Sequence, residues 1–270
     1  MSKHTILTET EFAGYMPNRR MLTFLEEYRS KTGANRRDIN VLDWGCGRGE
    51  DVLWLKEEGY NAFGVDVDAE PIQNGENLFR KKGYTDPGLS LIDPSGRTNF
   101  PDKYFHVIFS NLVFEHIANM ELVAAEFQRI TARSGMGYHG YHAHRHVVER
   151  HLFMPFIHWL PKNWLRKYFI FTCVLLGCEP KWEGLQKKGL MHMTKTYYTY
   201  SANKTFYRNY SNIRAIFENN GFAVHFETSN DPQLNKCRIV NKLTQYRLSR
   251  KVVDYSLLTF SNVELLLTKL

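Results

Sequence analysis

Short apolar runs alternate with amphipathic segments along most of the chain. Apolar runs of strand length lie near positions 40–44, 61–67, 89–93, 104–110 and 136–142. Apolar residues recur at helical spacing in residues 19–30 and 120–132, so we expect helices there. Strands that alternate with helices favour a parallel sheet covered by helices on both faces.

The C-terminal part adds one more helix and two more strands. Residues 211–220 are amphipathic and are followed by Gly221, a typical helix stop. Residues 222–228 and 262–268 predict a sixth and a seventh strand. The pattern therefore predicts an α/β fold with a seven-stranded, mostly parallel sheet in a single domain over residues 1–270.

The end of the first predicted strand carries glycines at alternate positions. The run V-L-D-W-G-C-G-R-G-E spans residues 41–50, and its glycines allow a close approach to a ligand. The next strand ends at Asp66, an acid placed to bind ribose hydroxyls. Nicotinamide or flavin dinucleotides and S-adenosylmethionine both suit this arrangement. The spacing D-x-G-x-G-x-G departs from the dinucleotide pattern G-x-G-x-x-G, and Glu50 suits a cationic amino-acid ligand better than a pyrophosphate.

Together with later motifs, these residues resemble the class I S-adenosylmethionine-dependent methyltransferases. The likeness includes G-V-D-V-D at 64–68, L-I-D at 91–93 and F-P-D-K-Y-F-H-V-I-F-S-N-L-V-F-E-H-I at 100–117. It implies a Rossmann-like sheet whose seventh strand inserts antiparallel to the sixth, and S-adenosylmethionine as the cofactor.

The resemblance also assigns cofactor-binding roles. The amino-acid part of the cofactor is expected to lie against Asp43, Gly45, Cys46, Gly47 and Gly49. The ribose is expected at Asp66, the adenine between Val67 and Asp93, and the sulfonium near Asn111 and Leu112.

His116 is the predicted catalytic residue. It lies in the loop after the fourth strand, where the family places the methyl group opposite the acceptor. A hydroxyl acceptor has to lose a proton, which a neutral imidazole is suited to take. The alternative is a structural role in which Glu115 and His116 cap the next helix or orient the loop.

Two long insertions, residues 143–210 and 230–260, are expected to form a substrate-binding lid. The first contains E-R-H and P-F-I-H-W-L-P, which resemble segments of methyltransferases associated with bacterial cell-surface glycans. Histidines concentrate in it, and the acceptor-binding candidates are His142, His144, His151 and His158. If the fifth strand continues, His142, His144 and His146 share one face; a metal site there is the less favoured interpretation, and we predict no metal.

Charge and hydropathy suggest further partners. Residues 1–150 carry a net charge of −3 and residues 151–270 a net charge of +10. The excess of positive charge in residues 151–270 either lies on a solvated surface or attracts an acidic partner. That partner would be a phosphate-bearing acceptor, an anionic membrane or, as the least favoured, nucleic acid. Residues 164–176 are too short to cross a bilayer. We expect a buried helix there, or one in a membrane interface with Lys162, Arg166 and Lys167 at the headgroups.

The N-terminal residues lack the apolar core of a signal peptide, and the four cysteines lack C-x-x-C spacing. We therefore expect a cytoplasmic protein, with membrane association as an option, and free thiols.

The expected activity is O-methylation of a small molecule or of a lipid-linked glycan precursor. N-methylation of a protein, RNA or a small amine is the enzymatic alternative. A nicotinamide-dependent dehydrogenase and a non-catalytic cofactor-binding protein remain as other classes.

Overall fold

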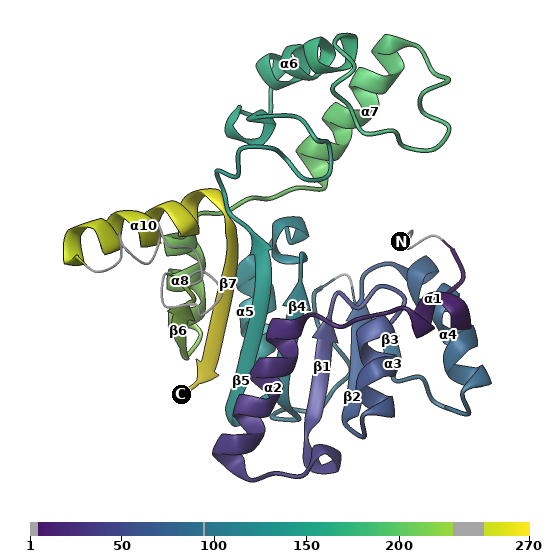
Figure 1. The fold of residues 1–270 in the computed structure, drawn as a ribbon, viewed down its shortest axis with the longest axis vertical. Coiled ribbons are helices and arrows are strands. Elements are labelled where there is room, and N and C mark those ends of the chain that lie inside the picture. The colour runs from purple at the N-terminus through teal and green to yellow at the C-terminus, as the bar shows by residue number, and fades with distance from the viewer. Residues whose placement is uncertain (1–4, 94, 229–245) are drawn as a thin grey trace.

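The computed structural model describes residues 5–93, 95–228 and 246–270. One seven-stranded sheet forms its centre, in the order β3-β2-β1-β4-β5-β7-β6 (Figure 1). Its strands are β1 (Asn40–Trp44), β2 (Asn61–Asp66), β3 (Leu89–Leu91), β4 (Phe105–Asn111), β5 (Thr131–His142), β6 (Phe222–Phe226) and β7 (Asn262–Lys269). Strands β1 to β5 are parallel, whereas β7 runs antiparallel to both β5 and β6. The predicted fold class is confirmed.

Helices cover both faces of the sheet. The helices of the described residues are α1 (Glu9–Ala13), α2 (Arg19–Thr32), α3 (Glu50–Glu57), α4 (Ala69–Lys81), α5 (Met120–Ile130), α6 (Trp164–Leu175), α7 (Leu190–Asn203), α8 (Tyr210–Asn219) and α10 (Arg247–Phe260), with short 3-10 helices η1 (Arg36–Asp38), η2 (Phe114–His116) and η3 (Ile157–Trp159). Of these, α6, α7 and η3 lie in the insertion and not on the sheet (Figure 1). Buried side chains of α5 and α8 pack on one face, and those of α1 to α4 on the other. Successive residues of a strand point to opposite faces, so Val41 packs with the second group and Leu42 with the first.

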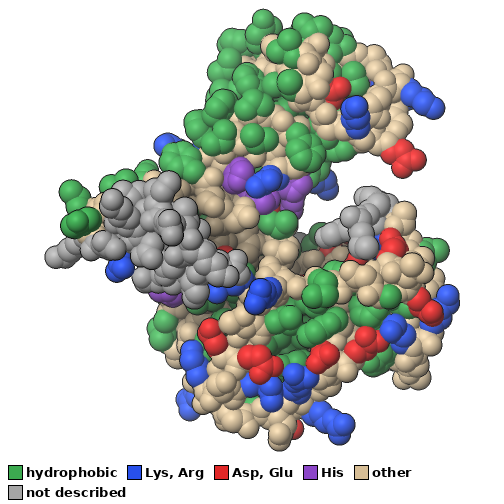
Figure 2. Space-filling model, in the orientation of Figure 1, with side chains coloured by type: hydrophobic (Ala, Val, Ile, Leu, Met, Phe, Trp, Pro, Cys, Tyr) green, Lys and Arg blue, Asp and Glu red, His purple; other side chains and the backbone are tan. Residues whose placement is uncertain are grey.

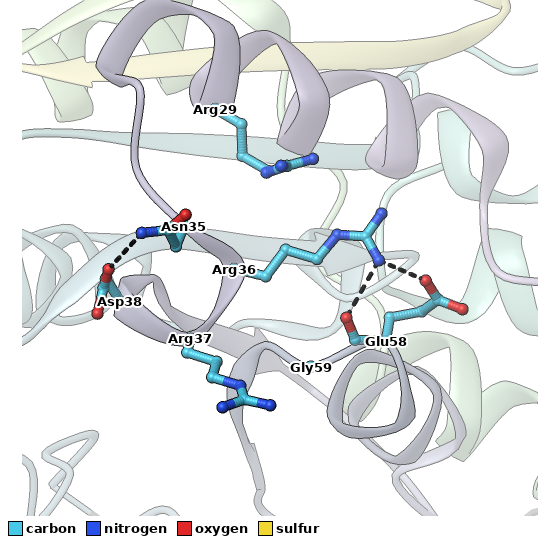
Figure 3. A pocket seen from close by; sticks show the side chains of 7 residues that line it. All are labelled: Arg29, Asn35, Arg36, Arg37, Asp38, Glu58 and Gly59. Carbon is cyan, nitrogen blue, oxygen red and sulfur yellow. Dashed lines mark hydrogen bonds and ion pairs between the residues drawn. The ribbon is translucent and has the colours of Figure 1, made fainter.

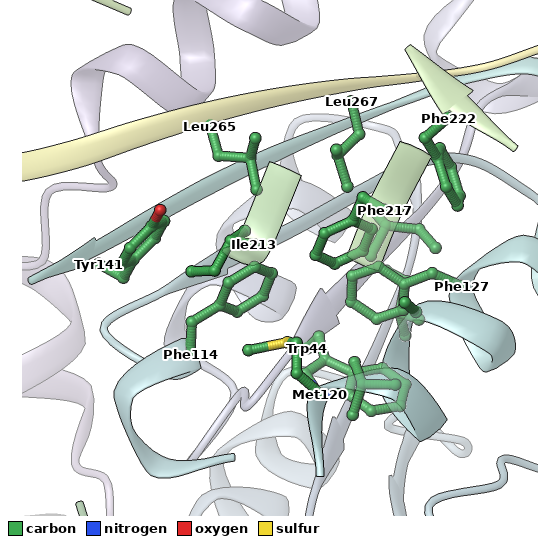
Figure 4. Close-up of a cluster of buried hydrophobic side chains, with 14 of the residues drawn as sticks. Trp44, Phe114, Met120, Phe127, Tyr141, Ile213, Phe217, Phe222, Leu265 and Leu267 are labelled. Atoms are coloured by element: carbon green, nitrogen blue, oxygen red, sulfur yellow. The ribbon is translucent and has the colours of Figure 1, made fainter. Parts of the chain in front are cut away.

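The core beneath α5 and α8 is rich in aromatic rings (Figure 4). Phe127 of α5 is 1% exposed, and its ring centroid lies 4.9 Å from that of Trp44 and 6.1 Å from that of Phe217. This cluster joins a helix from the middle of the chain, a helix from the C-terminal part and the central strand. It therefore fixes α5 and α8 to the sheet near the end of β1, where the glycine loop begins.

We expect Phe127→Ala to lower the free energy of unfolding by about 3–5 kcal/mol, because it removes a fully buried ring and leaves a cavity. Leu122→Ala is the matched control on the same helix, since Leu122 is 49% exposed. The control is expected to cost less than about 1 kcal/mol. Denaturant unfolding of both variants measures the difference, and equal losses would contradict the assigned core.

The start of β5 differs from the prediction. Thr131 pairs with Phe105, but the next pair is Met136 with Val107, so residues 132–135 form a bulge. Ser134 lies in the bulge with φ +56°. The strand therefore begins at Thr131, directly after α5, and not near residue 136. A bulge hides this start from the sequence pattern because its extra residues break the alternation of a strand.

The insertion 143–210 forms a separate layer beyond the carboxyl ends of the strands (Figure 1). It has a hydrophobic cluster of its own, which α6 and α7 share. The expectation that residues 164–176 form a buried helix is only half right. One side of α6 buries Ile170 and Cys173, but Trp164 is 75% and Tyr168 65% exposed.

The second insertion is described only from residue 246, where α10 leads into β7; residues 230–245 lie outside the described part of the chain. Cys46, Cys173 and Cys178 are free thiols, as expected, and Cys237 lies outside the described residues. Among the described helices, we find none that is long and apolar enough to cross a membrane.

Candidate functional site

A cavity of about 590 Å³ lies at the carboxyl ends of β1, β2 and β4. This edge of an open parallel sheet is where α/β proteins bind their ligands, and the volume lies in the range of small-molecule sites. Its walls come from the ends of these strands, from the segment after β3, from the loop after β4 and from the first turn of α5. The lining includes Trp44, Gly45, Asp66, Val67, Asp93, Leu112, Val113 and His116.

Hydrogen bonds from backbone N–H groups fix the conformation of the glycine loop. The N–H groups of Gly45 and Cys46 donate to Val65 O at 2.7 and 3.0 Å. The N–H of Gly47 donates to Asp66 Oδ2 at 2.8 Å, which ties the loop to the end of β2. Gly45 has φ +86°, and a Cβ built there would lie 2.4 Å from a Val113 methyl group. Only glycine fits at this position.

The predicted cofactor residues divide into two groups. Those that line the cavity are Gly45, Asp66, Val67, Asp93 and Leu112. Those that do not are Asp43, Cys46, Gly47, Gly49 and Asn111. Two residues of the second group pack behind the walls: the Cys46 side chain lies against Gly64, and Asn111 lies against Gly140.

The N-terminal segment also contacts the glycine loop, which the sequence pattern did not indicate. Arg48 is 1% exposed; its guanidinium pairs with Glu50 at 2.8 Å and donates to Thr5 O at 3.1 Å. Burial raises the pKa of Asp51 to about 6, and Tyr15 opposes this shift by hydrogen bonding to its carboxylate. Residues before α2 therefore help to fix the shape of the loop.

Gly75 of α4 is a further residue that the sequence analysis missed. A Cβ built on it would lie 1.8 Å from Arg48 O, so α4 packs directly on the backbone of the glycine loop. We expect Gly75→Ala to displace the loop, to weaken cofactor binding and to destabilise the fold by about 1–3 kcal/mol. Calorimetric titration and denaturant unfolding measure the two effects. Gly189→Ala, at a position with no atom within 4 Å, is the control and should change neither.

A partly buried polar cluster adjoins the cavity where the insertion meets the loop after β4. His116 Nε2 lies 3.1 Å from His151 Nε2, and His151 Nδ1 lies 2.7 Å from Glu149 Oε1. Tyr207 Oη donates to the same Glu149 oxygen at 2.6 Å. Figure 2 shows histidines gathered at the hollow between the insertion and the sheet domain. His116 alone of these residues lines the cavity itself, and His151 joins it to the insertion.

The electrostatics of this cluster favour a negative charge on Glu149. Burial would raise the pKa of Glu149, but hydrogen bonds from His151 and Tyr207 hold it below its usual value. Burial would lower the pKa of His151, but Glu149 raises it above its usual value. Glu115, directly before His116, is 2% exposed, and burial raises its pKa to about 7.

Other histidines lie around this cluster: the ring centroid of His142 is 6.3 Å from that of His151, and the ring centroid of His158 is 4.6 Å from that of Tyr207. β5 ends at His142, so His142, His144 and His146 do not share a strand face, and the condition for a metal site there fails. His142 Nδ1 lies 2.9 Å from Asn262 Oδ1. His144 and His158 line a second cavity of about 370 Å³ with the cations Lys162, Arg166 and Arg208.

A further hollow lies at the opposite edge of the sheet (Figure 3). It is formed by residues that precede β1 and β2, and Arg36 there already pairs with Glu58 Oε2 at 2.7 Å. Both the position at the amino ends of the strands and the paired charge disfavour it as the ligand site.

Most of the chain matches one known protein family. Residues 12–226 match the family described as a methyltransferase domain, a span that contains the glycine loop, Asp66 and the Glu115–His116 pair. The chain belongs to this family. Membership supports S-adenosylmethionine as the cofactor, in agreement with the motifs at the glycine loop and with the acid at the end of β2.

Individual relatives are similar over shorter segments or only in fold. A 2-heptyl-1-hydroxyquinolin-4(1H)-one methyltransferase of Mycobacteroides abscessus is 30% identical over 98 residues, which cover 36% of this chain and 42% of that protein. A sterol 4-C-methyltransferase of Caenorhabditis elegans is 26% identical over 98 residues, 36% of this chain and 29% of that protein. The matches thus span less than half the length of these curated relatives.

Solved structures show the same fold at low identity. Phosphoethanolamine N-methyltransferase 2 of Haemonchus contortus, in complex with S-adenosyl-L-methionine, superposes with a TM-score of 0.54 at 14% identity, over 97% of this chain and 57% of that chain. A sarcosine dimethylglycine methyltransferase structure from Galdieria sulphuraria superposes with a TM-score of 0.52 at 12% identity, over 93% and 84% of the two chains.

Proposed function

We propose that the protein is an S-adenosylmethionine-dependent methyltransferase that acts on a hydroxyl oxygen of a small molecule or of a lipid-linked glycan precursor. The position of His116 carries this proposal. His116 lines the same cavity as Gly45 and Asp66, and it connects that cavity to the partly buried cluster of His151 and Glu149. The cofactor pocket and a polar group suited to a hydroxyl therefore face one space.

The reaction needs alignment and the removal of one proton. An acceptor oxygen forms a bond to the methyl carbon, the carbon–sulfur electron pair stays on sulfur, and the hydroxyl proton leaves the acceptor. Alignment and exclusion of water supply most of the rate enhancement in such a displacement. A neutral amine would attack without losing a proton first, so the polar cluster at His116 favours oxygen over nitrogen as the acceptor atom.

Features of the insertion support the acceptor class. The second cavity brings together Lys162, Arg166 and Arg208, and their positive charge suits a phosphate-bearing acceptor. Each of the three already donates to backbone carbonyl oxygens, so the support is electrostatic. Exposed apolar side chains on α6, including Trp164 and Tyr168, suit contact with a lipid-linked acceptor at a membrane surface. The hydroxyquinolone relative is named for a hydroxylated small molecule, which agrees with the proposal.

The test is transfer of labelled methyl groups from S-adenosylmethionine to a cell extract separated into water-soluble small molecules, extractable lipids and macromolecules. We expect label in one of the first two fractions, with the product identified by mass spectrometry. Label confined to protein or RNA would contradict the proposal and favour the N-methyltransferase alternative. Binding of NAD without binding of S-adenosylmethionine would overturn the cofactor assignment.

A further inference from the structure

The hydrogen bonds of His116 and His151 determine which ring nitrogen carries the proton. His116 Nδ1 lies 2.6 Å from the carbonyl oxygen of Lys204, and His151 Nδ1 lies 2.7 Å from Glu149 Oε1. A carbonyl oxygen can only accept. The Glu149 carboxylate also acts as an acceptor, because Tyr207 Oη and the backbone N–H groups of His151 and Leu152 donate to it. Both histidines therefore donate from Nδ1, and in a neutral ring the lone pair lies on Nε2.

These two Nε2 atoms face each other at 3.1 Å. Two lone pairs at this distance repel, so the contact requires either a second proton on His151, whose pKa Glu149 raises, or a metal ion that both rings bind. The spacing matches that of two ligands of one metal ion, because nitrogens at about 2.0–2.1 Å from a tetrahedral Zn²⁺ lie about 3.3 Å apart.

Glu115 supplies an independent observation at the same place. Its carboxylate is buried and faces the backbone N–H groups of Glu115 and His142, but within the part of the chain that the structure describes no side chain donates a hydrogen bond to either oxygen. Its closest ion-pair contact among those residues is His142 Nε2, at 3.9 Å. Burial of a carboxylate without such partners is costly. One oxygen of Glu115 and one ring nitrogen each of His116 and His151 lie within 4.8 Å of one another, so a small rotation of Glu115 completes a three-ligand set.

We propose that Glu115, His116 and His151 bind a divalent first-row transition-metal ion, with Zn²⁺ as the best match. Two imidazoles and one carboxylate are a donor set of catalytic zinc sites, which keep a further position open. The Nδ1 hydrogen bonds to the Lys204 carbonyl and to Glu149 are the outer partners that metal-bound histidines usually have.

The site lies at the wall of the cofactor cavity, because His116 lines that cavity. The open position of the ion would hold the acceptor oxygen and lower the pKa of its hydroxyl, so that the proton leaves to solvent before methyl transfer. This role rests on the function proposed above, whereas binding of the ion does not. It also gives His116 a ligand role in place of the general base expected from its position in the sequence.

Metal binding to the untagged full-length protein tests the proposal without reference to activity. After treatment with a chelator and dialysis, we expect the protein to bind one Zn²⁺ or Co²⁺ per chain, and bound Co²⁺ to show the visible absorption of a four- or five-coordinate site. Loss of an outer partner costs about 10–100-fold in metal affinity. We therefore expect Glu149→Gln to weaken binding by that factor and Glu115→Gln to weaken it by at least about 100-fold.

His146→Gln is the matched control, because His146 lies in the same histidine-rich segment but its Nδ1 contacts Val148 O, outside the proposed ligand set. It should keep full binding. Two results would overturn the site: less than one Co²⁺ per chain on the wild-type protein, or equal metal affinity of the wild type and Glu115→Gln. The short contact between the two rings would then be explained by a proton shared between their Nε2 atoms. Stoichiometric metal without methyl transfer would instead contradict the proposed function and leave the metal site standing.

Discussion

Asp66→Ala is expected to lower the affinity for S-adenosylmethionine by about 100- to 1,000-fold. A carboxylate that accepts hydrogen bonds from both ribose hydroxyls contributes about 1.5–3 kcal/mol for each bond. Asp66 also accepts the N–H of Gly47 at 2.8 Å and that of Asp68 at 3.0 Å, so its loss releases the glycine loop as well. Isothermal titration calorimetry of the purified variant measures the change.

Asp86→Asn is the matched control for this experiment. Asp86 is exposed and accepts the N–H of Gly88 before β3, outside the lining of the cofactor cavity. Its replacement should leave the affinity unchanged. Circular dichroism and thermal unfolding of Asp66→Ala separate a loss of binding from a loss of folding. A folded Asp66→Ala protein that binds the cofactor as tightly as the wild type would show that Asp66 does not bind the ribose of the cofactor.

His116→Gln is expected to lower the turnover by about 10²- to 10⁴-fold, the usual contribution of a side chain that helps a reacting group lose its proton. The affinity for the cofactor should change by less than about threefold, because His116 Nε2 faces His151 and Nδ1 faces Lys204 O. His225→Gln, at an exposed position on β6, is the control and should keep full turnover.

The measurement is the initial rate of methyl transfer to the acceptor found in the extract, with cofactor affinity measured separately by calorimetry. Unchanged turnover in His116→Gln would contradict a part for this residue in the reaction. A parallel loss of turnover and cofactor affinity would assign His116 to cofactor binding instead.

Local patterns predicted much of the sheet domain. The glycine loop follows β1, Asp66 ends β2, and His116 lies in the loop after β4. Because the carboxyl ends of parallel strands meet at one edge of the sheet, their common location could be predicted from the sequence. The start of β5 was missed because the bulge around Ser134 interrupts the alternation. The short helix α1 was also missed, as was the ion pair of its Glu11 with Arg48 in the glycine loop, at 3.5 Å.

The polar cluster depends on contacts between distant segments. Glu149 and His151 were visible as an E-x-H pattern, but their meeting with His116 requires the insertion to fold back on η2. The backbone bond from Phe206 N to Glu115 O, at 2.6 Å, is part of that packing. No local periodicity encodes a contact over 91 residues of sequence, so Glu115 was not recognised as a site residue.

The nature of the bond that carries the transferred methyl group tests the central claim most directly. The acceptor isolated from the extract is methylated with S-adenosylmethionine that carries ¹³C in its methyl group, and the product is analysed by long-range carbon–proton NMR. We predict a methyl carbon bonded to oxygen. A methyl carbon bonded to nitrogen or to carbon would contradict an O-methyltransferase.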